Sequence, residues 1–269
     1  MELSQDQLRK LQLVEYDLLC EVDRICKKNG IRYTLYAGTL LGAIRHQGFI
    51  PWDDDADIAF TPDEYEKFYN ACKKDLNTEK YFLQDHRTDT HYRWGYAKLR
   101  RNNSSFVRAG QEHMKYHNGI CIDLFCLYSV PDNKITRKIY LDTFFVIRKL
   151  LYSEAGKVAS ENKLLRHVYH LLSKIPKECI FRFANAIICK KETELINILY
   201  CQQLPKYGIP RKCVLENIEM RFENSDFQAM KEYDEVMRAA YGDYMSFPPI
   251  EARVSHNPAS KIVFPIDAK

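Results

Sequence analysis

The stretch YAGTLLGAIRHQGFIPWDDDADIAF, residues 36–60, places a glycine turn and a helical segment ahead of four aspartates in five positions. Carboxylates this close together cannot be buried unless a cation or hydrogen-bond donors compensate their charge. The apolar residues 58–60 that follow predict a strand. Because residues two apart on a strand share a face, we expect Asp55 and Asp57 to point the same way, joined by Asp53 if the strand begins that early.

Carboxylates on one face of a sheet suit a hard cation, because magnesium and manganese prefer oxygen ligands and share phosphate oxygens with a substrate. We therefore expect Mg²⁺ or Mn²⁺ at the aspartates; a solvated acidic turn that caps the next helix is the alternative. The preceding residues favour the metal site. A β-rich run at 31–37 is followed by Gly38-Thr39 and by helical spacing over 40–46. A glycine turn that opens a helix lets backbone N–H groups approach a phosphate.

A third carboxylate, Asp123, interrupts an almost unbroken apolar run over residues 120–128. A lone carboxylate in a buried strand is costly unless it is compensated. Pairing with a nearby arginine or lysine, or a bond to a turn, would account for it. A metal ion shared with Asp55 and Asp57 explains it better.

The stretch from about residue 33 to residue 60 closely resembles the LicD family of phosphotransferases, which use a nucleotidyltransferase-type fold. The catalytic regions of fukutin and fukutin-related protein are similar to this family. The resemblance continues in short blocks at residues 96–100, 119–125, 241–245, 248–249 and 253–256. Members of the family transfer a phospho-alcohol group, best known as phosphocholine, from a CDP-linked donor to a glycan hydroxyl.

The resemblance implies roles for individual residues. The catalytic metal ligands would be Asp55, Asp57 and Asp123, and the turn facing the donor phosphates would be Gly38-Thr39. Thr39 stands where the wider nucleotidyltransferase pattern usually has serine or glycine, so its added methyl group is a departure.

Positive charge near the donor is the next expectation, because phosphoryl transfer needs stabilisation of the non-bridging oxygens. Arg45, on the predicted helix, and Lys98, in a matching block, are the candidates for binding the donor phosphates. For either residue, a surface salt bridge is the alternative.

Contacts to the rest of the substrate are predicted from aromatic and motif residues. A cage for a quaternary ammonium group, attracted to ring faces, could be built from Trp52, Tyr92, Trp94 and Tyr96. Such residues are more often part of the core or rim. Asp53 and His256, which fall in motif-like neighbourhoods, complete the candidate substrate contacts.

The sequence therefore predicts a metal-dependent phosphotransferase that moves a phospho-alcohol, most simply phosphocholine from CDP-choline, to a hydroxyl of a cell-surface glycan, with CMP leaving. The glycan acceptor could be lipid-linked. Transfer of the nucleotide itself is one alternative, and a non-catalytic scaffold relative is another. Retention of Asp53, Asp55, Asp57 and Asp123 argues against the scaffold.

Composition limits the other classes of function. The net charge of +4 is modest and charges are mixed along the chain, so nucleic-acid binding gets little support. Nine widely spaced cysteines without a C-x-x-C pair fit reduced thiols and a cytoplasmic location. The polar N-terminus does not resemble a signal segment, and we expect no membrane span.

The chain is expected to form an α+β fold in three parts. A nucleotidyltransferase-like core over residues 1–135 has a mixed sheet flanked by helices, a helical insertion or lid covers 136–204, and residues 205–269 pack back on the core. Helices are expected over residues 4–29, ended by Gly30, and from Pro62 onward. Strands are expected near 81–84, 92–99, 105–108 and 120–128.

The insertion combines basic and large apolar residues, which allows two interpretations. The favoured one is an ordinary lid that packs its apolar face on the core and leaves its lysines in water. The other is peripheral contact with an anionic bilayer, at the inner face of the membrane, which would bring the enzyme to a lipid-linked acceptor.

Overall fold

The structure is a computed structural model that describes residues 3–202, 205–255 and 258–266. Its centre is a mixed sheet whose strand order is β1 (Thr34–Leu35), β2 (Asp57–Phe60), β6 (Cys121–Val130), β4 (Ala97–Arg101) and β3 (Tyr81–Gln84). β2 and β6 are parallel, and the other neighbours in this order are antiparallel. The predicted α+β fold with a mixed sheet is confirmed.

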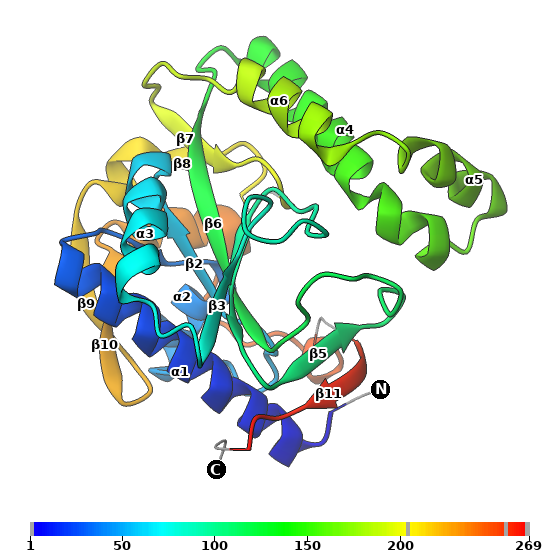
Figure 1. Ribbon diagram of the computed structural model, residues 1–269. Coiled ribbons are helices and arrows are strands. Elements are labelled where there is room, and N and C mark those ends of the chain that lie inside the picture. Colours follow the sequence, from blue (N-terminus) through cyan, green and yellow to red (C-terminus); the bar gives the residue numbers. More distant parts are fainter. Residues whose placement is uncertain (1–2, 203–204, 256–257, 267–269) are drawn as a thin grey trace.

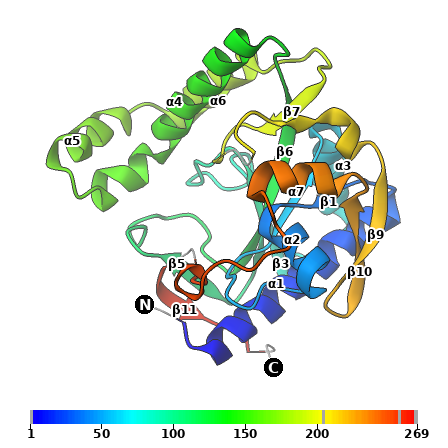
Figure 2. The same ribbon diagram turned by 180° about the vertical axis from the view of Figure 1, so that it is seen from behind.

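Helices cover both faces of the sheet. α1 (Gln5–Asn29) and α3 (Pro62–Asp75) lie on one face, while α2 (Ala37–His46) and α7 (Tyr233–Tyr241) lie on the other (Figures 1 and 2). The bounds of α1 follow from its sequence. Ser4 and the side chain of Gln7 form a capping box at its start, and Gly30, at φ 63°, ends it in the left-handed region as predicted.

Two further antiparallel strand pairs flank this core. β9 (Asn217–Phe222) pairs with β10 (Ser225–Met230), and β5 (Ser105–Arg108) pairs with β11 (Ala259–Val263). Short 3₁₀ helices, η1 (Arg211–Val214) and η2 (Ile250–Ala252), connect the later elements. Phe222 and Phe227 belong to the same buried cluster as the α1 side chains Leu18 and Val22, so the β9–β10 pair shares its core with α1.

The insertion forms an arm of three helices, α4 (Lys134–Ala159), α5 (Lys163–Leu172) and α6 (Lys177–Ile187), which extends to one side of the sheet (Figure 1). A second buried cluster, containing Phe144, Ile147 and Phe181, joins α4 and α6 to Tyr200. The range that we expected to be helical ends in a strand. The β-branched run β7 (Leu195–Ile198) pairs with the end of β6 and with β8 (Ile209–Pro210).

Two expected strands are shorter than predicted. Residues 92–96 are not in a strand, and β4 begins at Ala97. Residues 53–56 are also outside β2, since a turn after Pro51 brings the amide of Asp53 to the carbonyl of Ile50 at 2.9 Å. The strand alternation assumed for Asp53 and Asp55 therefore does not apply. Across the described ranges, no helix combines the length and the apolar character that a membrane span requires.

Candidate active site

Three charged residues lie abreast on neighbouring strands. In the sheet register, Asp57 of β2 pairs with Asp123 of β6, which in turn pairs with Lys98 of β4. Directly paired residues project from the same face, so these side chains lie beside one another; we call them the strand triad. Asp123 is 8% exposed and Lys98 6%, and the ammonium group of Lys98 forms an ion pair with the carboxylate of Asp123.

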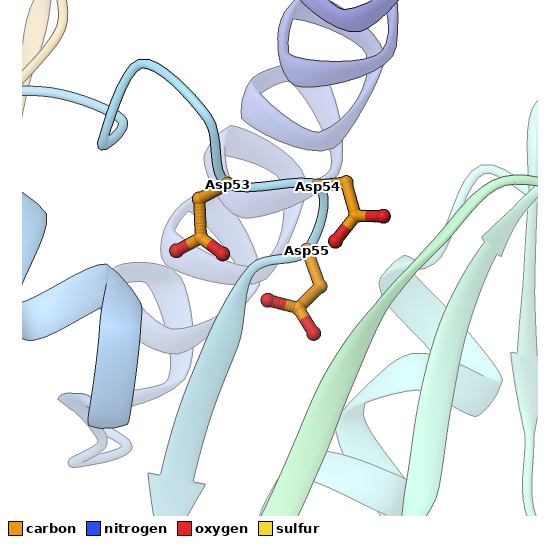
Figure 3. Close-up of side chains that lie close together, drawn as sticks. All are labelled: Asp53, Asp54 and Asp55. Atoms are coloured by element: carbon orange, nitrogen blue, oxygen red, sulfur yellow. The ribbon is translucent and has the colours of Figure 1, made fainter. Parts of the chain in front are cut away.

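Next to the strand triad lies the acidic loop, Asp53, Asp54 and Asp55, at the start of the segment that becomes β2. One carboxylate oxygen of each aspartate lies within 4.8 Å of the others, which is an arrangement that could hold a metal ion. Figure 3 shows Asp53 and Asp54 leaving the chain on opposite sides, with the carboxylate of Asp55 between and below them. The side-chain amide of Gln12 on α1 fixes the loop by donating to the carbonyls of Asp53 (2.9 Å) and Ile50 (3.3 Å).

The electrostatics of the site favour a cation. Burial raises the pKa of Asp57 well above its ordinary value, and the charges of Asp55 and Asp123 raise it further, while Lys98 acts in the opposite direction. Burial and the charges of Asp55 and Asp54 raise the pKa of Asp53 in the same way. Carboxylates that repel one another in a desolvated site gain stability when a divalent cation binds between them.

Glu15 of α1 adds another carboxyl group. It is buried, its pKa is raised well above the ordinary value by burial and then by the charge of Asp55, and its Oε2 has no hydrogen-bond partner among the described residues. The prediction from sequence missed Glu15 and Asp54. For Glu15 a signal was present, because it lies on the apolar stripe of α1 between Leu11 and Leu18.

Gly38 and Thr39, expected as a turn before the helix, lie in the first turn of α2, and they contact both acidic elements. The hydroxyl of Thr39 accepts a hydrogen bond from the amide of Asp57 (2.7 Å), and the amide of Tyr36 donates to the carbonyl of Asp57 (3.0 Å). A Cβ at position 38 would lie 2.7 Å from Oδ2 of the buried Asp53, so any larger residue there would have to displace this carboxylate. Thr39 thus has a structural partner at the head of β2, and its contact with a donor phosphate stays a prediction.

A cleft of about 730 Å³ opens on one side of the aspartates. Its lining includes Gly38, Arg45, Trp52, Asp53, Asp55, Asp57, Phe125 and Tyr241. Arg45 donates to the carbonyls of Tyr244 (3.0 Å) and Ser246 (3.1 Å), and its guanidinium carbon lies 4.9 Å from the centre of the Phe247 ring. This arginine therefore joins α2 to the C-terminal part of the chain at the cleft wall.

A narrower aromatic pocket of about 40 Å³ lies on the other side. Its rings come from Tyr92, Trp94, Tyr96, Phe106 and Tyr116. Trp94 lies 5.4 Å from Tyr92 and 5.2 Å from Tyr116 between ring centres. The same pocket is lined by charged side chains: Glu15, Asp54, Asp55, Lys98, Arg100, Arg108 and Asp123.

The structure thus brings together three of the four rings proposed as a cage. Trp52 instead lines the large cleft, 5.3 Å below the guanidinium carbon of Arg253. Tyr116 takes part in the aromatic pocket and was missed, because it lies in a loop far from the other rings in sequence. His256, another candidate, lies outside the described residues.

Comparisons with known proteins agree with this geometry. The sequence model of the LicD/FKTN/FKRP nucleotidyltransferase domain matches residues 30–155, which include the acidic loop and the strand triad. The chain is 29% identical over 269 residues to the lipopolysaccharide cholinephosphotransferase LicD of Haemophilus influenzae, covering 93% of this chain and 96% of that protein. It is also 36% identical over 97 residues to the uncharacterized protein RP689 of Rickettsia prowazekii, covering 27% of this chain and 36% of the other. Residues 30–155 of this chain therefore form a LicD/FKTN/FKRP nucleotidyltransferase domain, and the protein is a LicD-like transferase.

Proposed function

We propose that this protein transfers phosphocholine from CDP-choline to a hydroxyl of a lipopolysaccharide-type glycan and releases CMP. The observation that carries this proposal is the position of Asp55, which borders both the large cleft and the aromatic pocket. A donor that spans the two would place its diphosphate at the aspartates. The similarity to a lipopolysaccharide cholinephosphotransferase over 93% of the chain supports the same donor and class of acceptor.

The larger cavity matches the larger end of CDP-choline, its nucleoside, and the smaller cavity matches the smaller end, its trimethylammonium group. The cleft of about 730 Å³ is large enough for a nucleoside. The aromatic pocket of about 40 Å³ has space for roughly three water molecules, which is comparable to a trimethylammonium group. Aromatic faces attract a quaternary ammonium group, and the carboxylates of Glu15 and Asp54 face the same pocket.

The residues present fit a divalent cation. We propose that Mg²⁺ or Mn²⁺ is held by Asp55, Asp57 and Asp123, as the sequence predicts, with Asp53 and Asp54 of the acidic loop as the neighbouring oxygen ligands. A bound cation would screen the carboxylates from the diphosphate and polarise its oxygens.

The side chains of the site then have separate roles in the transfer. The acceptor hydroxyl attacks the phosphorus that carries choline, and the bond from this phosphorus to the oxygen of CMP breaks. One of the aspartates would accept the hydroxyl proton. Lys98 holds Asp123 and presents positive charge beside it, while Gly38 and Arg45 border the cleft where the nucleotide phosphate would lie.

A cytoplasmic site of action is part of this proposal. All nine cysteine side chains are free, which fits a reducing compartment. The lipopolysaccharide-type glycan would then be modified before it reaches the cell surface.

Release of CMP from a panel of CDP-alcohols, with a lipopolysaccharide oligosaccharide as acceptor, tests the proposal. We expect Mg²⁺-dependent release with CDP-choline and loss of release in Asp55→Asn and Asp57→Asn. Asp63→Asn, an exposed carboxylate on α3, is the matched control and should retain activity. Trp94→Leu should reduce the preference for CDP-choline over CDP-ethanolamine about tenfold, because a desolvated cation–π contact contributes about 1–2 kcal/mol.

Two results would count against the proposal. Release that persists in the Asp55 and Asp57 variants would remove the chemistry from this site. An unchanged donor preference in Trp94→Leu would remove choline from the aromatic pocket.

A further inference from the structure

Helix α5, at the far end of the arm, exposes most of its apolar surface. Leu164, Leu165, Val168 and Leu171 are between 40% and 75% exposed. The last three follow Leu164 by one, four and seven residues, a spacing that puts all four on one face of the helix. The other face carries the basic or titratable side chains Lys163, Arg166, His167 and His170. An amphipathic helix normally buries its apolar face, and α5 does not.

The helix is nevertheless well formed and anchored. Asn162 caps its start by accepting a hydrogen bond from the amide of Leu165 (3.1 Å). Within the part of the chain that the structure describes, Tyr169 is the one buried side chain of α5. Its ring packs against Gly156 of α4 and lies 5.7 Å from the ring of Tyr152. Attachment to α4 therefore uses Tyr169 and leaves the leucine face unpartnered.

Charge is concentrated on the same arm. Counted with the four residues that follow α6, the arm spans residues 134–191 and contains thirteen lysines and arginines and four aspartates and glutamates, a net charge of +9. The whole chain has +4, so the remaining residues carry −5. The arm also holds eleven of the twenty exposed large apolar side chains among the described residues, although it is 58 residues long. Apolar and basic surface thus coincide in about a fifth of the chain.

We propose that α5 docks on an anionic lipid bilayer, with its leucine face in the headgroup region. Leucine faces beside lysines and arginines are the combination that binds anionic membrane surfaces. Elsewhere on the arm, α4 also exposes Ile135, Ile139 and Val146 by more than half, with Lys138 and Lys149 beside them in helical spacing. A second copy of the chain is a poor occupant, because it would bring two surfaces of +9 together.

The arm also contacts the loop that completes the aromatic pocket. The ring of His113 is hydrogen-bonded to the carbonyl of Glu154 on α4 (3.0 Å), and a Cβ at Gly110 would lie 2.9 Å from Ala159. The same loop supplies Tyr116 to the pocket. A bilayer bound to the arm would therefore lie one loop away from the site of chemistry. The docking surface itself does not depend on the proposed reaction.

Flotation with vesicles tests this surface directly. The full chain is mixed with vesicles of phosphatidylcholine alone or with added phosphatidylglycerol, at physiological and at high salt. We expect binding to the anionic vesicles, weakened by salt, and at least tenfold weaker binding for the triple variant L164S/V168S/L171S. The matched control L13S/L215S/V263S changes three apolar residues of comparable exposure outside the arm and should bind like the wild type. Circular dichroism checks that both variants are folded.

Depth of insertion gives a second readout. The V168W variant adds a tryptophan to the leucine face, whereas the wild type has only Trp52 and Trp94. Vesicles with lipids brominated on the acyl chain should quench the tryptophan fluorescence of V168W more than that of the wild type.

Three results would overturn the proposal. The first is no binding to anionic vesicles, and the second is equal binding by the triple variant. The third is a concentration-dependent dimer in sedimentation that the triple variant abolishes, because a second copy would then cover the face. A lid would be indicated if the triple variant changed CMP release with a soluble acceptor and left vesicle binding unaltered.

Discussion

Replacing Lys98 by methionine should destabilise the protein strongly in the absence of metal. Lys98 and Asp123 are both more than nine-tenths buried, and their ion pair lies beside Asp57. Removing one partner of a buried pair leaves an uncompensated charge and costs about 3–5 kcal/mol in the free energy of unfolding. Here the remaining charge is negative and faces other carboxylates, so we expect the upper part of this range.

Replacing the other partner of the pair, Asp123, should lower the free energy of unfolding by less. Asp123→Asn removes the same ion pair but leaves Lys98 beside Asp57, whose pKa already reflects the charge of Lys98. We expect a loss of about 1–2 kcal/mol, which is the size of a charged hydrogen bond. Lys138→Met, which breaks an exposed pair with Asp142, is the control and should change stability by less than about 1 kcal/mol.

Urea denaturation in the presence of a chelator and then with excess magnesium is the assay. A ligand at one hundred times its dissociation constant adds about 2.7 kcal/mol to the free energy of unfolding. Magnesium should stabilise Lys98→Met more than the wild type, because that variant has one positive charge fewer in the site. The reasoning is refuted if Lys98→Met loses less than about 1 kcal/mol or if magnesium stabilises both proteins equally.

Other variants test separate parts of the site. In chelator, the free energy of unfolding of Asp55→Asn should exceed that of the wild type by about 1 kcal/mol, because the change relieves repulsion in the acidic loop. Calorimetry should show that magnesium no longer stabilises this variant. Gly38→Ala should cost about 1–3 kcal/mol in urea denaturation, because its Cβ would meet Asp53 at 2.7 Å; an unchanged midpoint would show that the loop yields freely. The ring of His86 lies 4.1 Å from that of Phe181 on α6, and burial lowers its pKa below 6.5. The unfolded chain then binds more protons near that pH, so stability should fall as pH drops through 6.5. Thermal unfolding of His86→Phe, which keeps the stacked ring, should lose part of this dependence, and an identical pH profile would contradict the assignment.

Much of the local structure could be predicted because it depends on local signals. The capping serine and Gly30 set the ends of α1, and Pro62 correctly predicted the start of α3. The strands at 81–84 and 105–108 were predicted with the observed bounds, since alternating or β-branched residues are bounded there by turns.

The candidate site was only partly predictable, because its geometry is set by sheet register. Asp57, Asp123 and Lys98 were each singled out, yet their alignment on three strands depends on pairing between distant segments. Lys98 was expected to bind donor phosphate, and the structure pairs it with Asp123, for which an ion pair had been only the alternative. Glu15 and Tyr116 come from a helix and a loop that no local motif connects to the aspartates.

The position of attack on the donor tests the central claim most directly. The wild type would be incubated with magnesium, CDP-choline and a lipopolysaccharide oligosaccharide, and both products would be identified by mass spectrometry, with Asp57→Asn as the control. The account predicts CMP and an acceptor heavier by one phosphocholine group, and neither product from the variant. Free phosphocholine together with a cytidylylated acceptor would contradict it, because the nucleotide itself would then be the group transferred.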